Sequence, residues 1–432
     1  MLLNKTQSVC QECLKVVDAE VVSIDEAVYL AKSCPQHGAS EMLVWPDREH
    51  YEWMKTFSFP FVRPKPFTAS QKGCPRDCGP CTGHLRKPTL VEIEITRRCN
   101  LRCPVCFMSA GKAEDDLPLS VIGEMFHNIR RQAGVTPGIQ ITGGEPTVRE
   151  DLAEIVALGR QAGFEGIEVN TNGLVIAHDI EFLARLKDAG LTGIYLQFDG
   201  LTPGVYTRVR GANLLGVKMK AIENCRRVGI QVVLAMTVID GTNLDQVGEV
   251  LRFALRNVDV VAGLALQPAF TSGRFEVGDP RRLNMGDVIF TLAKQCPDLI
   301  APRDFYPLGC SHPICSCGTY LVPSPEGFVP VTREITPAEY RAAFDAESPQ
   351  GSVLGDILLQ RTGEVPSGLS LVIMNYMDAA TMDIERLREC SMVVAVPDGR
   401  ILPFCSYHLT SCSGERIHSA HVESVVPVEA VR

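Results

Sequence analysis

Three cysteines in the first half of the chain are spaced to bind a metal cluster that keeps one reactive position. Cys99, Cys103 and Cys106 follow the pattern Cys-x3-Cys-x2-Cys directly after the strand-like run 90–95. Each iron of a cubane [4Fe–4S] cluster takes one cysteine thiolate, so three cysteines leave the fourth iron open. An open iron beside a substrate pocket can do chemistry, whereas a four-cysteine cluster stores or passes electrons. The alternative is a structural metal site built from the same three thiolates.

A glycine-rich motif follows the second predicted strand. Gly143 and Gly144 let the backbone approach a ligand closely. Glu145 can accept a hydrogen bond from an ammonium group, and Pro146 completes the motif. On its own such a motif predicts only a turn. Its position one strand and one helix after the cysteines indicates a ligand site.

Polar side chains end three further predicted strands: Asn170 and Asn172 the third, Gln197 and Asp199 the fourth and, more weakly, Gln267 the sixth. Polar groups at the ends of buried strands face a desolvation cost, for which a bound ligand is a natural partner. The alternative for each is an ordinary strand-to-loop turn.

These motifs together resemble the signature of the radical S-adenosylmethionine (SAM) superfamily, including the aromatic Phe107 directly after the third cysteine. The resemblance implies that the three cysteines hold a [4Fe–4S] cluster whose open iron chelates SAM. It implies that residues 143–146 contact the amino group of SAM, and that Phe107 and the strand-end residues complete its binding site. In this family one electron cleaves SAM to methionine and a 5′-deoxyadenosyl radical, which abstracts hydrogen from an unactivated C–H bond.

The elements that must position these motifs alternate between strand and helix. The predicted strands are 91–96, 138–142, 166–170, 193–198, 230–238 and 258–267. The predicted helices, with apolar residues at helical spacing, are 120–133, 151–162, 179–189, 214–228 and 244–256. Ser120 is a predicted N-cap, and the predicted helix-closing glycines are Gly134, Gly163, Gly190 and Gly229. Repeated βα units predict a parallel α/β sheet. The family resemblance selects a partial (β/α)6 barrel with catalytic groups at the C-terminal strand ends.

The remaining cysteines indicate further metal sites. The chain has 17 cysteines in 432 residues, clustered in short spacings. Such clusters indicate metal in a reducing compartment rather than a disulfide framework. We predict an N-terminal Cys-rich metal-binding domain over 1–88, the barrel over 89–300 and a C-terminal auxiliary iron–sulfur domain over 301–432. The start of the chain lacks a long apolar segment, so we expect no secretory signal and a cytoplasmic location.

Three groups of residues are predicted to bind these metals. The first, suited to one mononuclear iron or zinc ion, is Cys10, Cys13, Cys34 and His37. The second, with cubane spacing, is Cys74, Cys78 and Cys81, with His84 as a candidate fourth ligand. The third, a closed auxiliary [4Fe–4S] cluster, is Cys310, Cys315, Cys317 and Cys405. Spacing does not fix connectivity, so a member of the second group could replace His37. Structural zinc throughout is the alternative. Cys225 and Cys296 are expected to be buried small hydrophobes, and Cys390 and Cys412 have no assigned role.

The bulk composition excludes some classes of function. The net charge of −9 argues against binding to nucleic acid. The sequence contains no run of 18 apolar residues, so we predict no transmembrane segment, while contact with a membrane surface stays open. Arg208 and Arg210 would either neutralise an anionic group or form a solvated surface pair. With nucleic acid excluded, the expected substrate is a small molecule or a lipid.

A narrower resemblance covers all three sections of the chain. Its motifs are Cys-x2-Cys and Cys-Pro-x-His-Gly near the N-terminus, Gly-Cys-Pro-x-Asp-Cys-Gly-x-Cys, and the segments 195–200 and 304–315. They are similar to the archaeal tetraether lipid synthases and to their relatives described as dihydropterin-precursor methyltransferases. The resemblance implies auxiliary iron–sulfur clusters, a rubredoxin-like iron and an electron donor such as ferredoxin or flavodoxin.

This resemblance predicts two enzymatic functions, and a non-enzymatic function stays open beside them. The first prediction is C–C coupling of lipid chains, and the second is radical methylation of a pterin precursor or another small molecule. An iron–sulfur electron-transfer protein is the alternative from a different class. A long apolar tunnel would favour the lipid, and a compact polar pocket would favour the pterin.

Overall fold

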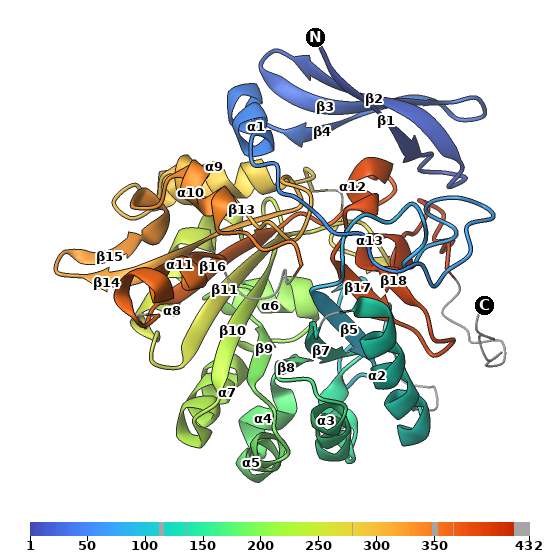
Figure 1. The fold of residues 1–432 in the computed structure, drawn as a ribbon. Helices are drawn as coiled ribbons and strands as arrows, with labels where there is room; N and C mark the ends of the chain where they lie inside the picture. Colours follow the sequence, from blue (N-terminus) through green and yellow to red (C-terminus); the bar gives the residue numbers. More distant parts are fainter. Residues whose placement is uncertain (112–115, 135, 279, 348–352, 366, 419–432) are drawn as a thin grey trace.

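The N-terminal section forms an antiparallel sheet of its own. The computed structural model describes residues 1–111, 116–134, 136–278, 280–347, 353–365 and 367–418. The N-terminal sheet consists of β1 (Leu2–Val9), β2 (Val16–Ile24), β3 (Ala27–Cys34) and β4 (Gly38–Trp45). It lies at the top of the molecule in Figure 1 and is followed by α1 (Arg48–Lys55). The sequence analysis did not predict these strands, although β2 alternates buried Val17, Ala19 and Val21 with exposed Asp18 and Glu20.

The larger sheet contains the predicted strand–helix repeat. Its central parallel strands are β5 (Leu90–Glu94), β7 (Gly138–Thr142), β8 (Ile167–Thr171), β9 (Gly193–Gln197), β10 (Gln231–Val238) and β11 (Val261–Pro268). The predicted helices are α2 (Leu119–Ala133), α3 (Leu152–Gln161), α5 (Ile180–Asp188), α7 (Leu215–Val228) and α8 (Val247–Arg256). Helices without a prediction are α4 (Leu174–His178), α6 (Pro203–Arg210) and α9 (Met285–Gln295). The predicted α/β fold with repeated βα units is therefore confirmed.

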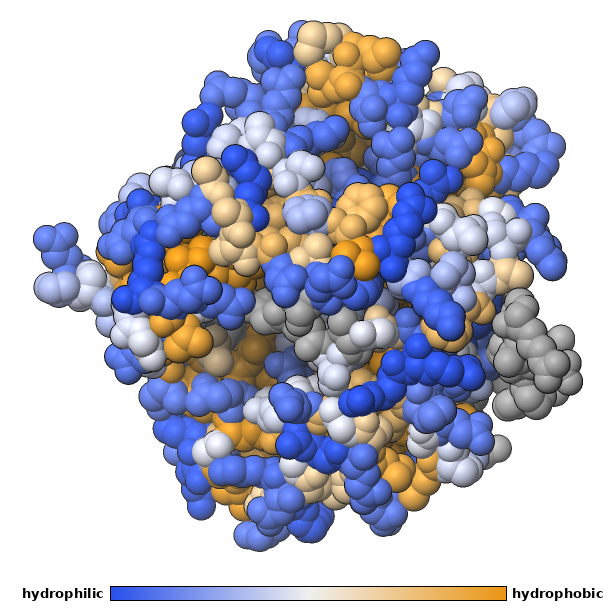
Figure 2. Space-filling view, in the orientation of Figure 1, coloured by the Kyte–Doolittle hydropathy of each residue, from blue (hydrophilic) through white to orange (hydrophobic). Residues whose placement is uncertain are grey.

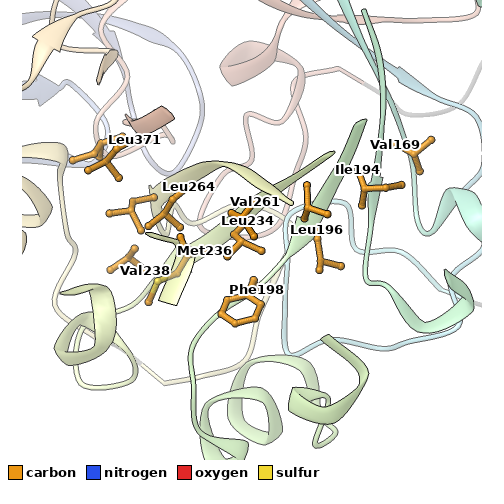
Figure 3. Packing of buried hydrophobic residues seen from close by; sticks show 14 of the residues in the cluster. Val169, Ile194, Leu196, Phe198, Leu234, Met236, Val238, Val261, Leu264 and Leu371 are labelled. Atoms are coloured by element: carbon orange, nitrogen blue, oxygen red, sulfur yellow. The ribbon is translucent and has the colours of Figure 1, made fainter. Parts of the chain in front are cut away.

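Alternation along the central strands separates an apolar face from a polar one. Leu196 of β9 and Leu234 of β10 are fully buried in the main hydrophobic core (Figure 3). Phe198, directly after β9, stacks on Phe253 of α8 with ring centroids 5.3 Å apart. Successive strand residues face opposite sides of a sheet. Residues of the other parity, such as Glu92 of β5, line a cavity instead.

The predicted helix-end residues agree with the structure with one exception. The predicted helix-closing glycines all have left-handed φ angles: Gly134, Gly163, Gly190 and Gly229. Residues with a Cβ rarely adopt this conformation. The start of α2 differs from the prediction, because Pro118 occupies the N-cap position and no side chain caps the helix. Ser120 therefore lies inside the first turn and is not the N-cap.

The C-terminal section extends the larger sheet at both edges. β16 (Leu369–Met374) pairs in parallel with β11, and β17 (Met392–Ala395) pairs in parallel with β5. The outer strands are β13 (Tyr306–Pro307), β14 (Ser316–Ser324), β15 (Gly327–Pro330) and β18 (Ile401–Pro403). The helices of this section are α10 (Pro337–Ala342), α11 (Val353–Thr362), α12 (Ile384–Arg388) and α13 (Phe404–Tyr407). The predicted boundary near residue 300 thus divides the sequence but not the sheet.

Polar contacts join the N-terminal sheet to the C-terminal section. The buried Lys32 of β3 donates from Nζ to the carbonyl oxygens of Ala379 and Ala380 at 2.6 and 3.0 Å. The Thr6 hydroxyl donates to Asp383 at 2.7 Å. Because these groups are buried, specific hydrogen bonds fix the N-terminal sheet to the C-terminal section.

Hydrophilic side chains cover most of the face drawn in Figure 2, with smaller apolar patches between them. Scattered exposed apolar residues are normal on a folded chain. Among the described helices, none combines the length and apolar character needed to cross a membrane.

Candidate functional site

A cavity of about 200 Å³ collects most of the residues predicted to bind the cluster and SAM. Those in its wall are Cys99, Cys103, Cys106, Phe107, Gly143, Gly144, Glu145, Asn170, Asn172 and Gln197. Two predicted residues lie outside the wall. Pro146 begins the buried 3-10 helix η1 (Pro146–Val148), and Asp199 is fully buried behind its neighbours. The cavity lies at the C-terminal ends of the parallel strands, where barrel enzymes place their active sites.

The segment that carries the three cysteines, residues 96–111, is called the cysteine loop. Within it β6 (Val105–Cys106) pairs with β12 (Arg274–Phe275) in a short antiparallel ladder. Arg274 donates from Nε to the carbonyl oxygen of Cys103 at 2.6 Å. Arg210 donates to the carbonyl oxygen of Val105 at 3.0 Å. These contacts fix the loop through its backbone, and Arg210 also hydrogen-bonds the thiol of Cys103.

The two glycines of the Gly-Gly-Glu-Pro motif are required by the cysteine loop. The N–H of Gly144 donates to the carbonyl oxygen of Thr96 at 2.8 Å, and the N–H of Glu145 donates to that of Arg98 at 2.9 Å. A Cβ on Gly143 would overlap the Thr96 carbonyl, and a Cβ on Gly144 would overlap the Arg98 carbonyl. The sequence analysis attributed both glycines to a nearby ligand. The structure adds a reason within the chain, because two backbones meet here.

Glu145 is buried, and protein donors occupy much of its carboxylate. Oε1 accepts hydrogen bonds from the Thr147 N–H at 3.1 Å and from the hydroxyls of Thr147 and Thr171 at 2.5 and 2.7 Å. Oε2 accepts from the N–H of Asn172 at 2.7 Å. A carboxylate oxygen offers two lone pairs, so Oε2 keeps the spare capacity for an ammonium group. Glu145 also ties the glycine motif to the end of β8.

Arg210 and Asp199 form a buried ion pair beside the cysteine loop. Their Nε–Oδ2 and Nη2–Oδ1 distances are 2.7 and 2.8 Å. Asp199 also accepts hydrogen bonds from the Gln197 amide and the Thr237 N–H. Arg210 lies in the cavity wall, so the alternative of a solvated surface pair is wrong for this residue. Asp199 therefore acts on the cavity through three residues of its wall, Arg210, Gln197 and Thr237.

A buried lysine, which the sequence analysis missed, connects two strand ends. Lys218 of α7 donates from Nζ to the carbonyl oxygen of Asn172 at 2.5 Å and to the amide oxygen of Gln197 at 2.7 Å. Burial lowers the pKa of Lys218 to about 7. The available signal was helical spacing, which puts Lys218 in the buried stripe of α7 with Ile222 and Cys225.

The three thiols of the cysteine loop suit a cationic cluster. Burial raises the pKa of Cys99 to about 12, and Glu145, Cys103 and Cys106 add smaller contributions. Burial also raises the pKa of Cys103. Thiolates gathered in a buried wall repel one another and need a cationic partner, which iron supplies. The donor type, spacing and shared wall therefore fit a [4Fe–4S] cluster held by three cysteines.

The four predicted ligands of the N-terminal site come together. The ligand atoms of Cys10, Cys13, Cys34 and His37 all lie within 4.8 Å of one another. His37 Nδ1 is 3.3 Å from Cys10 Sγ and 3.5 Å from Cys34 Sγ. The backbone N–H of Gln36 is the main cause that lowers the pKa of Cys34 to about 6. Three cysteines and one histidine suit a tetrahedral zinc or iron ion, with His37 as the fourth donor.

The second predicted group also lies together. The thiol of Cys78 raises the pKa of Cys74, and the thiol of Cys74 hydrogen-bonds that of Cys81. His84, the candidate fourth ligand, is buried and its ring hydrogen-bonds the backbone of Cys390. The structure therefore supports the three cysteines as neighbours, while the role of His84 as fourth ligand stays a prediction.

In the third group, Cys390 joins two of the four predicted cysteines. Cys315 and Cys405 lie beside Cys390, each close enough to raise the pKa of its buried thiol. Arg386 donates from Nε to Cys315 Sγ at 3.4 Å. Cys317, a predicted ligand, lies instead within β14 in the main hydrophobic core. Burial alone raises the pKa of Cys317, without a contribution from another cysteine.

Cys310, the remaining predicted member, has a partly exposed position before β14. Burial raises the pKa of Tyr340, and Cys310 and Cys317 add to this effect, so both thiols lie near the Tyr340 ring. Cys225 and Cys296 are fully buried among apolar residues, in agreement with their expected role as small hydrophobes. The assignment of Cys310 and Cys317 to the third metal site stays a prediction.

The cavity wall also contains side chains that the sequence analysis missed: Glu92, Tyr195, Phe270, Tyr376 and Phe404. Gln267, whose placement was predicted, donates from Nε2 to the hydroxyl of Tyr195 at 2.8 Å. Burial raises the pKa of Glu92 to about 8, with a contribution from Glu94. The signal for Glu92 was two glutamates at alternate positions within the apolar run 90–95.

Comparisons with known proteins agree with these motifs. Residues 93–254 match the family described as Radical SAM superfamily, and residues 2–46 match the HMPTM N-terminal zinc ribbon domain. The chain is 33% identical over 472 residues to a 7,8-dihydro-6-hydroxymethylpterin dimethyltransferase of Methanocaldococcus jannaschii, covering 94% of this chain and 93% of that one. It is 28% identical to a GTP 3′,8-cyclase of Alkaliphilus oremlandii, covering 54% of this chain and 77% of the relative.

A solved structure is also similar to part of the chain. Streptococcus suis SuiB bound to S-adenosylmethionine is 17% identical over 50% of this chain and 48% of that chain, with a TM-score of 0.42.

Proposed function

Since this chain belongs to the radical SAM superfamily, we propose that it is a radical SAM methyltransferase acting on a pterin or a closely related small heterocycle. The observation that carries the proposal is a cavity wall in which carboxylate, amide and aromatic groups lie beside the cysteine loop. The near full-length similarity to an enzyme named for pterin dimethylation supports it.

The chain's own residues would bind SAM and orient the reacting groups. When bound, a [4Fe–4S] cluster held by the three cysteines of the cysteine loop supplies, with SAM, a 5′-deoxyadenosyl radical that can remove hydrogen from an unactivated C–H bond. Oε2 of Glu145 and the backbone of residues 143–146 would receive the ammonium group of SAM. Lys218 holds the ends of β8 and β9 in register by its two hydrogen bonds. With substrate bound, the wall would shield the reacting groups from water and competing hydrogen donors.

The character of the wall favours a small polar substrate over a lipid chain. Glu92, Asn170 and Gln267 are polar groups among the aromatic side chains of the cavity. A hydrocarbon chain would leave Oε2 of Glu92 and Oδ1 of Asn170 without hydrogen-bond partners, which costs free energy. Pterin methylation, the second prediction, therefore ranks above lipid-chain coupling, the first. An electron-transfer protein would not need a substrate cavity beside an open iron.

The proposed reaction needs further components. Replacing a ring hydrogen by a methyl group requires a one-carbon donor, and cleavage of SAM requires a one-electron donor, for which ferredoxin or flavodoxin is our prediction. We assign auxiliary iron–sulfur clusters to the groups around Cys74 and around Cys390, where they would pass or accept electrons. The N-terminal quartet is assigned a structural zinc or iron ion.

Anaerobic expression in a bacterial host tests this proposal, because the host supplies electron and one-carbon donors. Extracted pterins should carry added methyl groups by mass spectrometry, and cells expressing Cys103→Ala should lack them. The same experiment in cells supplied with archaeal-type lipids tests the alternative. If the pterins stay unmodified and coupled isoprenoid chains form, lipid coupling is the better-supported function.

A further inference from the structure

Two oxygen atoms in the cavity wall lack hydrogen-bond partners. Oε2 of Glu92 and Oδ1 of Asn170 are both enclosed, and no donor from the described parts of the chain reaches either atom. Glu92 is 4% exposed, and both residues line the cavity. Buried polar atoms in native proteins are almost always paired, so unpaired ones need an explanation. The Asn170 oxygen is an acceptor, and Oε2 of Glu92 is one when the carboxyl group is ionised, so a ligand that carries N–H donors would satisfy both atoms.

The neighbouring amide donors are already engaged elsewhere. Gln140, opposite Glu92 in the ladder between β5 and β7, donates from Nε2 to Glu168 at 3.0 Å. Asn170 donates from Nδ2 to Oε1 of Gln140 at 3.4 Å. The side-chain amide donors of Gln140 and Asn170 are therefore directed along the sheet, towards Glu168. Neither amide donates to Oε2 of Glu92 or to the side-chain oxygen Oδ1 of Asn170.

Aromatic rings form another part of the same wall. The rings of Tyr376 and Phe404 have centroids 4.5 Å apart, and those of Phe270 and Tyr376 are 5.4 Å apart. All three side chains line the cavity with Glu92. Aromatic side chains pack favourably against flat rings in stacked or edge-to-face arrangements. The wall thus combines a surface for a planar ring with acceptors for its edge.

We propose that Glu92, assisted by Asn170, binds the amidine edge of the substrate, a ring N–H beside an exocyclic amino group in a planar 2-amino-4-oxopyrimidine ring. A carboxylate accepts two parallel N–H donors from such an edge, as it does from a guanidinium group. The inference rests on the proposed function and assigns the residue that selects the class of ring. Burial raises the pKa of Glu92 to about 8, as expected for a carboxyl group that has lost water and gained no donor.

Binding to the cluster-loaded protein with SAM tests the inference. The probe is 6-hydroxymethyl-7,8-dihydropterin, titrated anaerobically and followed by calorimetry. Glu92→Gln keeps the side-chain shape but replaces one acceptor oxygen by an amino group, so the Kd should rise by about 100-fold or more. Glu154→Gln is the control, because Glu154 is an exposed carboxylate on α3 outside the cavity wall. Its Kd should stay close to that of the unmodified protein.

A change in the ligand gives a second measurement that does not depend on the folding of a variant. The analogue with an oxo group in place of the 2-amino group should bind the unmodified protein about 100-fold more weakly. Equal binding of both ligands, or full binding by Glu92→Gln, would overturn the role of Glu92 and leave the proposed function standing. Tight, Glu92-dependent binding without methylation would support the inference and refute the proposed function. Absence of binding to the unmodified protein would overturn both.

Discussion

The carbonyl oxygen of Thr96 accepts a hydrogen bond of 2.8 Å from the backbone N–H of Gly144. This contact joins the glycine motif after β7 to the first residue of the cysteine loop. The two sequence signals are separated by a helix, yet they form one structural unit. Because the neighbour of each glycine is backbone rather than a movable side chain, a Cβ at either position must push the two segments apart.

Gly144→Ala is therefore expected to displace the cysteine loop from the glycine motif. A displacement of about 1 Å can lower turnover by about 100-fold, and we expect a loss of this order in 5′-deoxyadenosine formation. Gly123→Ala on α2 is the control, because a Cβ there meets nothing within 4 Å. It should leave turnover intact and raise thermal stability slightly, since alanine favours helix over glycine. Equal activity of the two variants would contradict the close-packed interface.

Asp199→Asn should destabilise the protein strongly. It removes the charge partner of Arg210 in a buried pair, which typically costs about 3–5 kcal/mol. The control is Asp259→Asn, which breaks the exposed pair between Asp259 and Arg226 and should cost about 1 kcal/mol or less. Anaerobic thermal unfolding of the metal-loaded proteins measures both. Similar melting temperatures for the two variants would show that the Arg210 pair does not hold the cysteine loop.

Cys390→Ser and Cys317→Ser separate the observed cysteine group from the predicted one. Cys390 lies with Cys315 and Cys405, whereas Cys317 lies in the hydrophobic core. Cys390→Ser should lower the iron content by about four atoms per chain, the content of one cubane. Cys317→Ser should leave iron content unchanged. Iron and sulfide assays on anaerobically purified protein measure both variants. Loss of iron from Cys317→Ser but not from Cys390→Ser would contradict this assignment.

The ionisation of Glu92 should make the stability of the protein depend on pH. Its pKa is raised from 4.5 to about 8 in the folded protein by burial. The folded protein thus keeps a proton that the unfolded chain has lost between these values. This contribution to stability is fully present below pH 4.5 and is lost as pH rises through about 8.

Glu92→Gln cannot ionise, so its melting temperature should improve relative to the unmodified protein as pH rises across this range. Glu154→Gln, at an exposed site on α3, is the control and should show a constant difference. A constant difference for Glu92→Gln as well would contradict a neutral, buried Glu92.

The parts of the fold that depend on local patterns were predicted well. The strands β7 and β10 and the helices α2 and α7 follow from apolar periodicity and from glycines such as Gly134 and Gly229. The N-terminal ligand quartet follows from short Cys-x2-Cys and Cys-x2-His spacings. Such signals lie within one element or one turn, so a single sequence is enough to detect them.

The parts that depend on long-range pairing were not predicted. β17 joins β5 across about three hundred residues of sequence, and no local pattern indicates that partner. The proximity of Cys390 to Cys315 was likewise not predictable from a local pattern. Cys317 was chosen instead because it is nearer to Cys315 in the sequence. Lys218 and Glu92 were not predicted, because a charged residue within an apolar pattern carries no local sign that it is buried. Their burial becomes meaningful only when a cavity with polar walls is known.

The central claim is that the three cysteines of the cysteine loop support reductive cleavage of SAM. The most direct measurement is anaerobic release of 5′-deoxyadenosine from the reduced, iron-loaded protein. The account predicts steady release from the unmodified protein and none from Cys103→Ala, which should still bind iron at its remaining sites. No release from the unmodified protein, or undiminished release from Cys103→Ala, would contradict it.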